Sequence, residues 1–149
     1  MILNKPLSFY KEEKQLFENE LVQINKKLFK LSMTRLFVFL SIIFCGWFFF
    51  GNMKVIIPVL IIGIALFFYL VTIYSDLKFL KQKTQELIKI NQIEINVLNG
   101  DLSDLSDGDQ FKDPTHFYSY DIDLFGKGSF FQYLNRTTVK TGKEKLAAI

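Results

Sequence analysis

The chain has 149 residues, of which 50% are hydrophobic and 22% are charged, and its formal net charge is +3 at pH 7. This length suits one small domain, or a membrane anchor together with part of a domain. The single cysteine, Cys45, excludes an internal disulfide. The charges change sign from segment to segment, so the chain is not a uniformly basic nucleic-acid-binding protein.

The first segment, residues 1–35, is predicted to be a cytoplasmic amphipathic helix. We expect a helix over residues 8–35, with Ser8 as its N-terminal cap. Apolar residues recur there at intervals of four and three, which is the spacing of a coiled-coil seam. These residues are Phe17, Leu21, Ile24, Leu28 and Leu31.

Two uncharged apolar runs follow, at residues 36–50 and 55–73, and only residues 51–54 separate them. As a helix the second run would be about 28 Å long, close to the roughly 30 Å of a bilayer's hydrocarbon core. Residues 36–73 are therefore predicted to form a transmembrane hairpin. The alternatives are a buried helical pair in a soluble protein and a cleaved signal peptide. The long polar stretch before the first run opposes the signal peptide.

Basic residues flank the hairpin on its outer sides and predict its topology. Under the positive-inside rule both termini lie in the cytoplasm and the short turn, with Lys54 alone, lies outside. Arg35 is expected to extend toward the interface, and Gly46 and Gly63 permit close approach of the two helices. The flanking basic residues are Lys26, Lys27, Lys30 and Arg35 before the hairpin, and Lys78, Lys81, Lys83 and Lys89 after it.

Residues 74–99 are predicted to be a returning amphipathic helix that ends at Asn99 and Gly100. Its apolar seam, which polar residues interrupt, is expected to pair with the first helix as an antiparallel coiled coil, because the turn keeps both helices at high local concentration. The alternatives are a homodimer through the seams and a helix lying on the membrane surface. The seam contains Leu77, Leu80, Leu87 and Leu98, with interruptions at Thr84, Asn91 and Glu94.

Residues 100–119 are acidic and rich in turn formers, and they are predicted to be a solvated linker. A calcium loop would need oxygen ligands at alternate positions before Gly108, but Leu105 occupies one of these positions. The only histidine, His116, has no cysteine partners. We therefore predict no metal site in the chain.

Residues 120–137 read YDIDLFGKGSFFQYLNRT, and residues 138–146 read TVKTGKEKL. The first string resembles the start of the core domain of the MutS family of DNA mismatch repair proteins, where an acidic and apolar stretch leads into a G-S-L-(F/L)-x-x-L-(N/D)-R-T helix. The second resembles the T-x-x-G-x-x-x-L turn and helix that follow. The family-motif positions are Asp123, Phe125, Gly126, Ser129, Asn135, Arg136, Thr137 and Gly142.

Residues 111–120, which read FKDPTHFYSY, resemble a membrane-anchored bacterial branch of that family, in which a two-span N-terminus replaces the mismatch-reading domains. The resemblance implies attachment to the bacterial inner (cytoplasmic) membrane. It also implies a P-loop ATPase that uses ATP and Mg beyond residue 149, and DNA as a partner of the whole protein. The chain itself contains no G-x-x-x-x-G-K-[ST] motif. We therefore assign it no catalytic residue and no cofactor of its own.

Residues 120–149 also predict local structure without the resemblance. Ser129 is expected to cap a helix with an apolar stripe of Phe130, Phe131, Leu134 and Tyr133, closed by residues 135–137. Thr141 and Gly142 are expected to form a turn before a helix at residues 143–149. A basic cluster is the candidate for phosphate or nucleic-acid contact, and a solvated helix face is its alternative. The cluster contains Arg136, Lys140, Lys143 and Lys145.

The sequence as a whole predicts an all-α chain that anchors a MutS-like ATPase to a membrane, with the lipid bilayer as its partner. Residues 120–149 would begin the truncated core domain. One alternative function is that of a small, complete membrane scaffold without catalysis. Another is a regulatory subunit whose acidic linker and basic tail bind each other or lipid headgroups.

Overall fold

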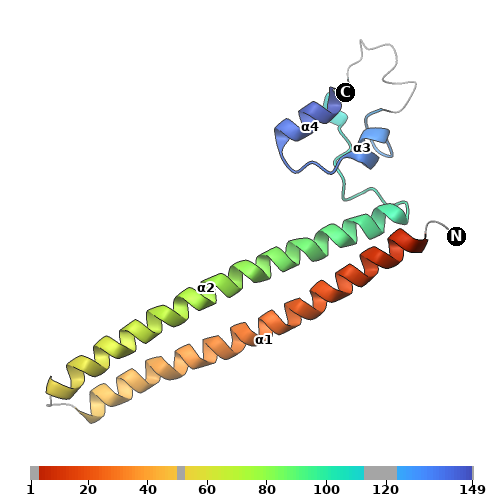
Figure 1. Cartoon of the computed structure of the whole chain (residues 1–149). Helices are drawn as coiled ribbons and strands as arrows, with labels where there is room; N and C mark the ends of the chain where they lie inside the picture. Colours follow the sequence, from red (N-terminus) through yellow and green to blue (C-terminus); the bar gives the residue numbers. More distant parts are fainter. Residues whose placement is uncertain (1–3, 50–52, 113–123, 149) are drawn as a thin grey trace. The chain divides into compact units, whose positions relative to one another are not determined.

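A computed structural model of the chain describes residues 4–49, 53–112 and 124–148 (Figure 1). The described residues form helices and contain no β-strand, which confirms the predicted all-α class. They divide into two compact units. The hairpin unit is Glu13–Lys89, and the terminal unit combines Met1–Glu12 with Ile90–Ile149. The elements are α1 (Asn4–Phe48), α2 (Met53–Leu98), the 3-10 helix η1 (Asp109–Phe111), α3 (Phe130–Leu134) and α4 (Lys140–Ala147).

Helix α1 begins earlier than the sequence pattern predicts. It starts at Asn4, so Ser8 lies inside the helix rather than at its cap. The Ser8 hydroxyl donates a hydrogen bond to the carbonyl of Lys5, 3.0 Å away. Pro6 stands in the first turn, where its missing N–H costs no helical hydrogen bond and its fixed φ favours the helix. The prediction of Ser8 as the cap is therefore wrong.

Helices α1 and α2 run side by side and antiparallel in the hairpin unit (Figure 1). The predicted seam of α1 faces inward, because Ile24 and Leu28 are buried. On α2, the buried positions Gly63, Leu70 and Thr84 are separated by whole heptads. The heptad pattern therefore continues from the polar ends of the helices into the apolar runs, without a break at residues 35–36 or 73–74.

One predicted seam position on α2 is wrong. Leu80 is 38% exposed, whereas Thr84 is only 2% exposed. Leu77 and Thr84 are one heptad apart, so the seam follows this pair and places Leu80 at its edge. The threonine that seemed to interrupt the seam is part of it.

Two contacts fix how α1 and α2 meet within the hairpin unit. The side chain of Ile42 fills the space beside Gly63, where a Cβ atom would lie 2.7 Å from the Ile42 Cδ1 atom. The guanidinium of Arg35 lies across the hairpin, with its Cζ atom 5.7 Å from the ring centroid of Phe67 and 5.2 Å from that of Tyr74. A Cβ built on Gly46 meets no described atom within 4 Å, so of the two glycines only Gly63 permits a close approach.

Helix α2 ends as the sequence predicts. The amide of Gly100 donates to the carbonyl of Val97 at 2.9 Å, and the amide of Asp101 donates to that of Asn96 at 2.9 Å. Gly100 has a φ of 87°, the left-handed conformation that this paired hydrogen-bond pattern requires. Glycine is favoured here because it adopts this conformation without steric strain.

Candidate functional site

The terminal unit is organised around the short helix α3. Ser129 caps it as predicted, since its Oγ accepts a hydrogen bond from the amide of Gln132 at 3.2 Å. The Gln132 side-chain oxygen in turn accepts from the amide of Gly128 at 2.8 Å. This reciprocal arrangement is close to a capping box, which the Ser-x-x-Gln spacing of residues 129–132 could have indicated. Gln132 was not predicted to have a structural role.

The side chain of Gln132 also binds the acidic segment, residues 101–112, to α3. It is buried, and its Nε2 atom donates to the carbonyls of Leu102 and Leu105, both 2.9 Å away. The Nδ2 atom of Asn135, another buried amide, donates to the carbonyl of Ser106 at 3.4 Å. Within the predicted solvated linker, buried side-chain amides thus hold three backbone carbonyls, while the side chains of Asp101, Asp104 and Asp109 stay exposed.

Three aromatic rings form the apolar centre beside this network. The ring centroids of Phe111, Phe125 and Phe131 lie 5.3 to 6.0 Å apart. Of the predicted stripe, only Phe131 is buried, whereas Phe130 is 60% exposed. Tyr133 and Leu134 are 53% and 45% exposed. A helix of five residues turns only one narrow face to its neighbours, so the remaining apolar side chains of α3 face outward.

Arg136 joins the end of α3 to α2 within the same unit. Its Nε atom donates to Oε1 of Glu94, and its Nη2 atom donates to Oε2 at 3.1 Å. Its Nη1 atom donates to the carbonyl of Tyr133 at 2.8 Å. The guanidinium thus engages both carboxylate oxygens, which is the stronger geometry of such pairs. Sequence reasoning missed Glu94, because nothing in its local pattern indicates a partner 42 residues away.

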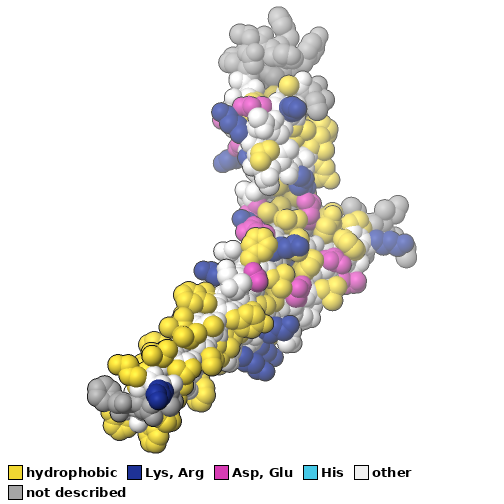
Figure 2. All heavy atoms as spheres, turned by 60° about the vertical axis from the view of Figure 1, so that its left-hand side comes forward, with side chains coloured by type: hydrophobic (Ala, Val, Ile, Leu, Met, Phe, Trp, Pro, Cys, Tyr) yellow, Lys and Arg dark blue, Asp and Glu magenta, His cyan; other side chains and the backbone are white. Residues whose placement is uncertain are grey.

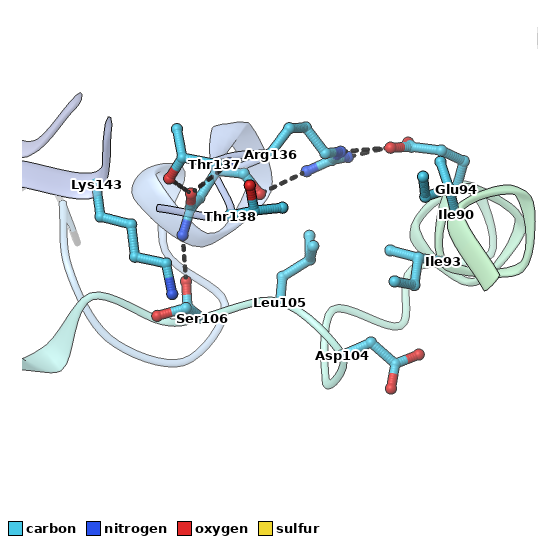
Figure 3. A pocket seen from close by; sticks show the side chains of 11 residues that line it. Ile90, Ile93, Glu94, Asp104, Leu105, Ser106, Arg136, Thr137, Thr138 and Lys143 are labelled. Carbon is cyan, nitrogen blue, oxygen red and sulfur yellow. Dashed lines mark hydrogen bonds and ion pairs between the residues drawn. The ribbon is translucent and has the colours of Figure 1, made fainter. Parts of the chain in front are cut away.

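A cavity of about 350 Å³ lies between the end of α2, the acidic segment and the segment that joins α3 to α4 (Figure 3). Its lining includes the apolar side chains of Ile90, Ile93 and Leu105, together with two threonines and several charged residues. Figure 3 shows the side chain of Lys143 extending toward Ser106 at one end. The arrangement offers apolar contact together with hydrogen-bond donors. Among the described residues, no group of three His, Cys, Asp or Glu side chains could hold a metal ion.

The four residues of the predicted basic cluster have different surroundings. Arg136 and Lys143 both line the cavity, but Glu94 already pairs with Arg136. The Nζ atom of Lys140 lies 3.8 Å from a carboxylate oxygen of Glu144, one turn along α4. Lys145 lies exposed in the last turn of α4. The cluster is therefore not one surface of free positive charges.

The predicted turn at Thr141 and Gly142 is wrong. Both residues lie inside α4, which begins at Lys140. A Cβ atom built on Gly142 would lie 3.2 Å from the Cβ of Thr137, so the glycine allows α4 to pack closely on the segment before it. The family-motif position Asp123 and the only histidine, His116, lie outside the described residues.

Asp101 closes a small turn directly after α2. Its Oδ1 atom accepts a hydrogen bond from the amide of Ser103 at 3.0 Å. This bond, together with a second one from the Ser103 side chain, holds the pKa of the Asp101 carboxyl below its ordinary value of 3.8. The side chain is exposed, so the effect comes from these hydrogen bonds and not from burial.

Three comparisons bear on the identity of the chain. No model of a known protein family matches it, and neither a curated protein nor a solved structure does. The functional assignment therefore depends on the residues and contacts described above.

Proposed function

We propose that the hairpin unit anchors the chain in a lipid bilayer. The observation that carries this proposal is the exposure of its apolar side chains. Both α1 and α2 are long and apolar enough to cross a membrane, yet only 6% of the most apolar window of each helix is buried. Figure 2 shows hydrophobic side chains covering the surface of the hairpin near its turn. Water-soluble monomers rarely expose a continuous apolar surface of this size.

The exposed side chains surround the pair of helices. Phe37 and Trp47 of α1 are 72% and 76% exposed, and Ile62 and Phe68 of α2 are 68% and 65% exposed. Inside the pair, Ile42 packs against Gly63. The hairpin thus has a packed interior seam and an apolar exterior, which is what a pair of membrane-spanning helices requires.

In the proposed topology both ends of the hairpin unit lie in the cytoplasm, at the inner membrane of a bacterium. The basic flanks support this orientation, since only Lys54 lies near the turn, and the resemblance to the anchored MutS-like branch implies the bacterial membrane. Cysteine labelling tests this arrangement in a Cys45→Ser background. In spheroplasts, an impermeant maleimide should label Lys54→Cys, whereas Ser103→Cys should react only after lysis. Equal labelling of both positions, or release of the protein by carbonate washing, would contradict the proposal.

We further propose that the anchored chain is the N-terminal region of a MutS-like P-loop ATPase, whose ATP-, Mg- and DNA-binding parts follow residue 149. The support is the resemblance of residues 120–146, together with the structural roles of the matching residues. Ser129 caps α3, Asn135 binds the acidic segment and Arg136 binds Glu94. These motif residues thus shape the beginning of a helical domain.

The mass of the native protein tests this second proposal independently. An antibody against residues 100–125 should detect a membrane protein several-fold heavier than 17.4 kDa. Its ATPase activity and DNA binding would then be assayed. A single band at 17.4 kDa would overturn the ATPase proposal and leave a small membrane scaffold, with the cavity beside Lys143 as its candidate binding surface.

A further inference from the structure

An exposed phenylalanine lies among lysines on the outer face of each helix, just beyond the apolar run. Phe29 of α1 is 65% exposed and Phe79 of α2 is 71% exposed. Exposed lysines accompany each ring at positions one to four residues away. We call this set the collar, and it contains Lys26, Phe29 and Lys30 of α1 with Lys78, Phe79 and Lys83 of α2.

The two halves of the collar lie at the same level of the hairpin unit. Arg35 of α1 contacts Phe67 and Tyr74 of α2, so this contact aligns the two antiparallel helices. Moving away from the turn, Phe29 follows this contact on α1 and Phe79 follows it on α2. Both rings point away from the seam, since residues that pack in the seam, such as Leu28 and Thr84, are buried.

This level of the hairpin is strongly positive. Residues 26–35 and 74–83 together contain seven basic side chains and one acidic side chain, Asp76. On α1, Lys26 and Lys30 stand beside a shallow open hollow that Val22 and Phe29 also line. An apolar surface with two ammonium groups at its border fits a molecule that carries both an anionic and an apolar part.

We propose that the collar binds anionic phospholipids and selects them over zwitterionic ones. The lysines contact the lipid phosphate and headgroup, while Phe29 and Phe79 pack among the glycerol groups and the upper acyl chains. A soluble phosphate would satisfy the lysines but would leave both exposed rings in water, so the collar favours a lipid. This inference rests on the proposed membrane insertion of the hairpin.

Tryptophan quenching by brominated lipids separates the two claims. The full chain is reconstituted in equimolar phosphatidylglycerol and phosphatidylcholine, with bromine on the acyl chains of one lipid or the other. The native Trp47, at the far end of the hairpin from the collar, reports insertion. A Phe29→Trp reporter in a Trp47→Phe background reports the lipid at the collar.

We expect brominated phosphatidylglycerol to quench the Phe29→Trp reporter more strongly than brominated phosphatidylcholine does. Neutralising Lys26 and Lys30 to glutamine should remove this preference. Each lysine is expected to contribute a factor of roughly five to the affinity for phosphatidylglycerol relative to phosphatidylcholine. The matched control, Lys140→Gln with Lys145→Gln, removes the same charge from α4 and should leave the preference unchanged. The preference should also fall with added salt.

The outcomes distinguish the inference from the function on which it rests. If neither lipid quenches Trp47, the hairpin does not insert and the anchor proposal fails. If both lipids quench Trp47 but the Phe29→Trp reporter shows no preference, the collar inference alone is overturned. A preference that survives the loss of Lys26 and Lys30 would overturn it as well.

Discussion

Ile42 of α1 fills the space left by the missing side chain of Gly63 on α2. A Cβ atom at position 63 would lie 2.7 Å from both Cδ1 and Cγ1 of Ile42. These atoms belong to the outer part of a side chain that can change rotamer. A single added methyl group can therefore be accommodated, but a larger side chain must separate the helices.

We expect Gly63→Leu to disrupt the hairpin and Gly63→Ala to leave it nearly intact. Spin labels on cysteines at Gln23 and Glu86, in a Cys45→Ser background, would report the distance between α1 and α2. Gly63→Leu should lengthen and broaden this distance distribution, and adding Ile42→Ala should restore it. Ala65→Leu is the matched control, since Ala65 is exposed on the same helix. An unchanged distribution for Gly63→Leu would contradict the close contact.

Cys45 offers a test of whether α1 and α2 pair within one chain. Cys45 and Val59 line the same small void, of about 10 Å³, between the helices. In membranes, mild oxidation of Val59→Cys should form a disulfide with Cys45 that migrates at the mass of one chain. Ile62→Cys, on the exposed face, should not form this bond. If Val59→Cys gave only disulfide-linked dimers, the seams would pair between chains, as in the homodimer alternative.

The ion pair between Arg136 and Glu94 is expected to stabilise the docking of α3. Both side chains are partly exposed, so the pair contributes at most about 1 kcal/mol, which is roughly a fivefold change in local opening. In Arg136→Lys, which cannot reproduce the two-pronged contact, the amides of Phe131 and Asn135 should exchange hydrogen faster. Glu94→Gln should give a similar change, and the double variant should be no worse than either single one. Fully additive effects would show that the two residues act separately.

The parts of the fold that were predicted correctly are those fixed by neighbouring residues. The spacing of Ile24 and Leu28, the helix stop at Gly100 and the cap at Ser129 each depend on a few positions along the chain. A heptad pattern or a cap imposes its geometry within one or two helical turns, so the sequence alone reveals it. The two long apolar helices were also predicted correctly, because their length and composition can be read directly from the sequence.

Apart from Ser8, the predictions that the structure changes concern residues whose contacts lie outside their local sequence pattern. Gln132 binds carbonyls 27 and 30 residues before it, so the acidic segment looked like a free linker. Gly142 looked like a turn former, but it lies inside α4 against Thr137. Thr84 looked like a break in the seam, although the seam continues through it. In each case a tertiary contact outweighs the local preference of the residue.

Gly108 is expected to tolerate no side chain. Its φ is 71°, and a Cβ atom there would lie 2.5 Å from Cδ1 of Phe131. Gly108→Ala therefore combines a left-handed backbone, which costs roughly 1–2 kcal/mol for an L-residue, with a clash against the aromatic cluster. We expect lower near-ultraviolet circular dichroism and faster proteolysis of the terminal unit. Gly100→Ala is the control, since the φ of Gly100 is also positive but a Cβ atom built there meets no atom within 4 Å. Equal effects of both substitutions would exclude the contact with Phe131.

The carboxyl of Asp101 is expected to make the turn after α2 sensitive to acid. Hydrogen bonds from Ser103 lower its pKa in the folded chain, so the charged form is the stabilising one. Their contribution is complete above the ordinary pKa of 3.8 and is lost as the pH falls through the lowered pKa. Carbon-13 NMR of the Asp101 carboxyl should therefore show a titration midpoint below 3.8.

Two substitutions at Ser103 separate the two hydrogen bonds to Asp101. Ser103→Ala removes the hydroxyl but keeps the amide, which has the larger effect on the pKa, so the midpoint should rise only part of the way toward its ordinary value. Ser103→Pro removes the amide hydrogen as well, so the midpoint should return to the ordinary value. If both variants titrate like the native chain, the lowered pKa has another cause. In that case the turn at Asp101 would not be what responds to acid.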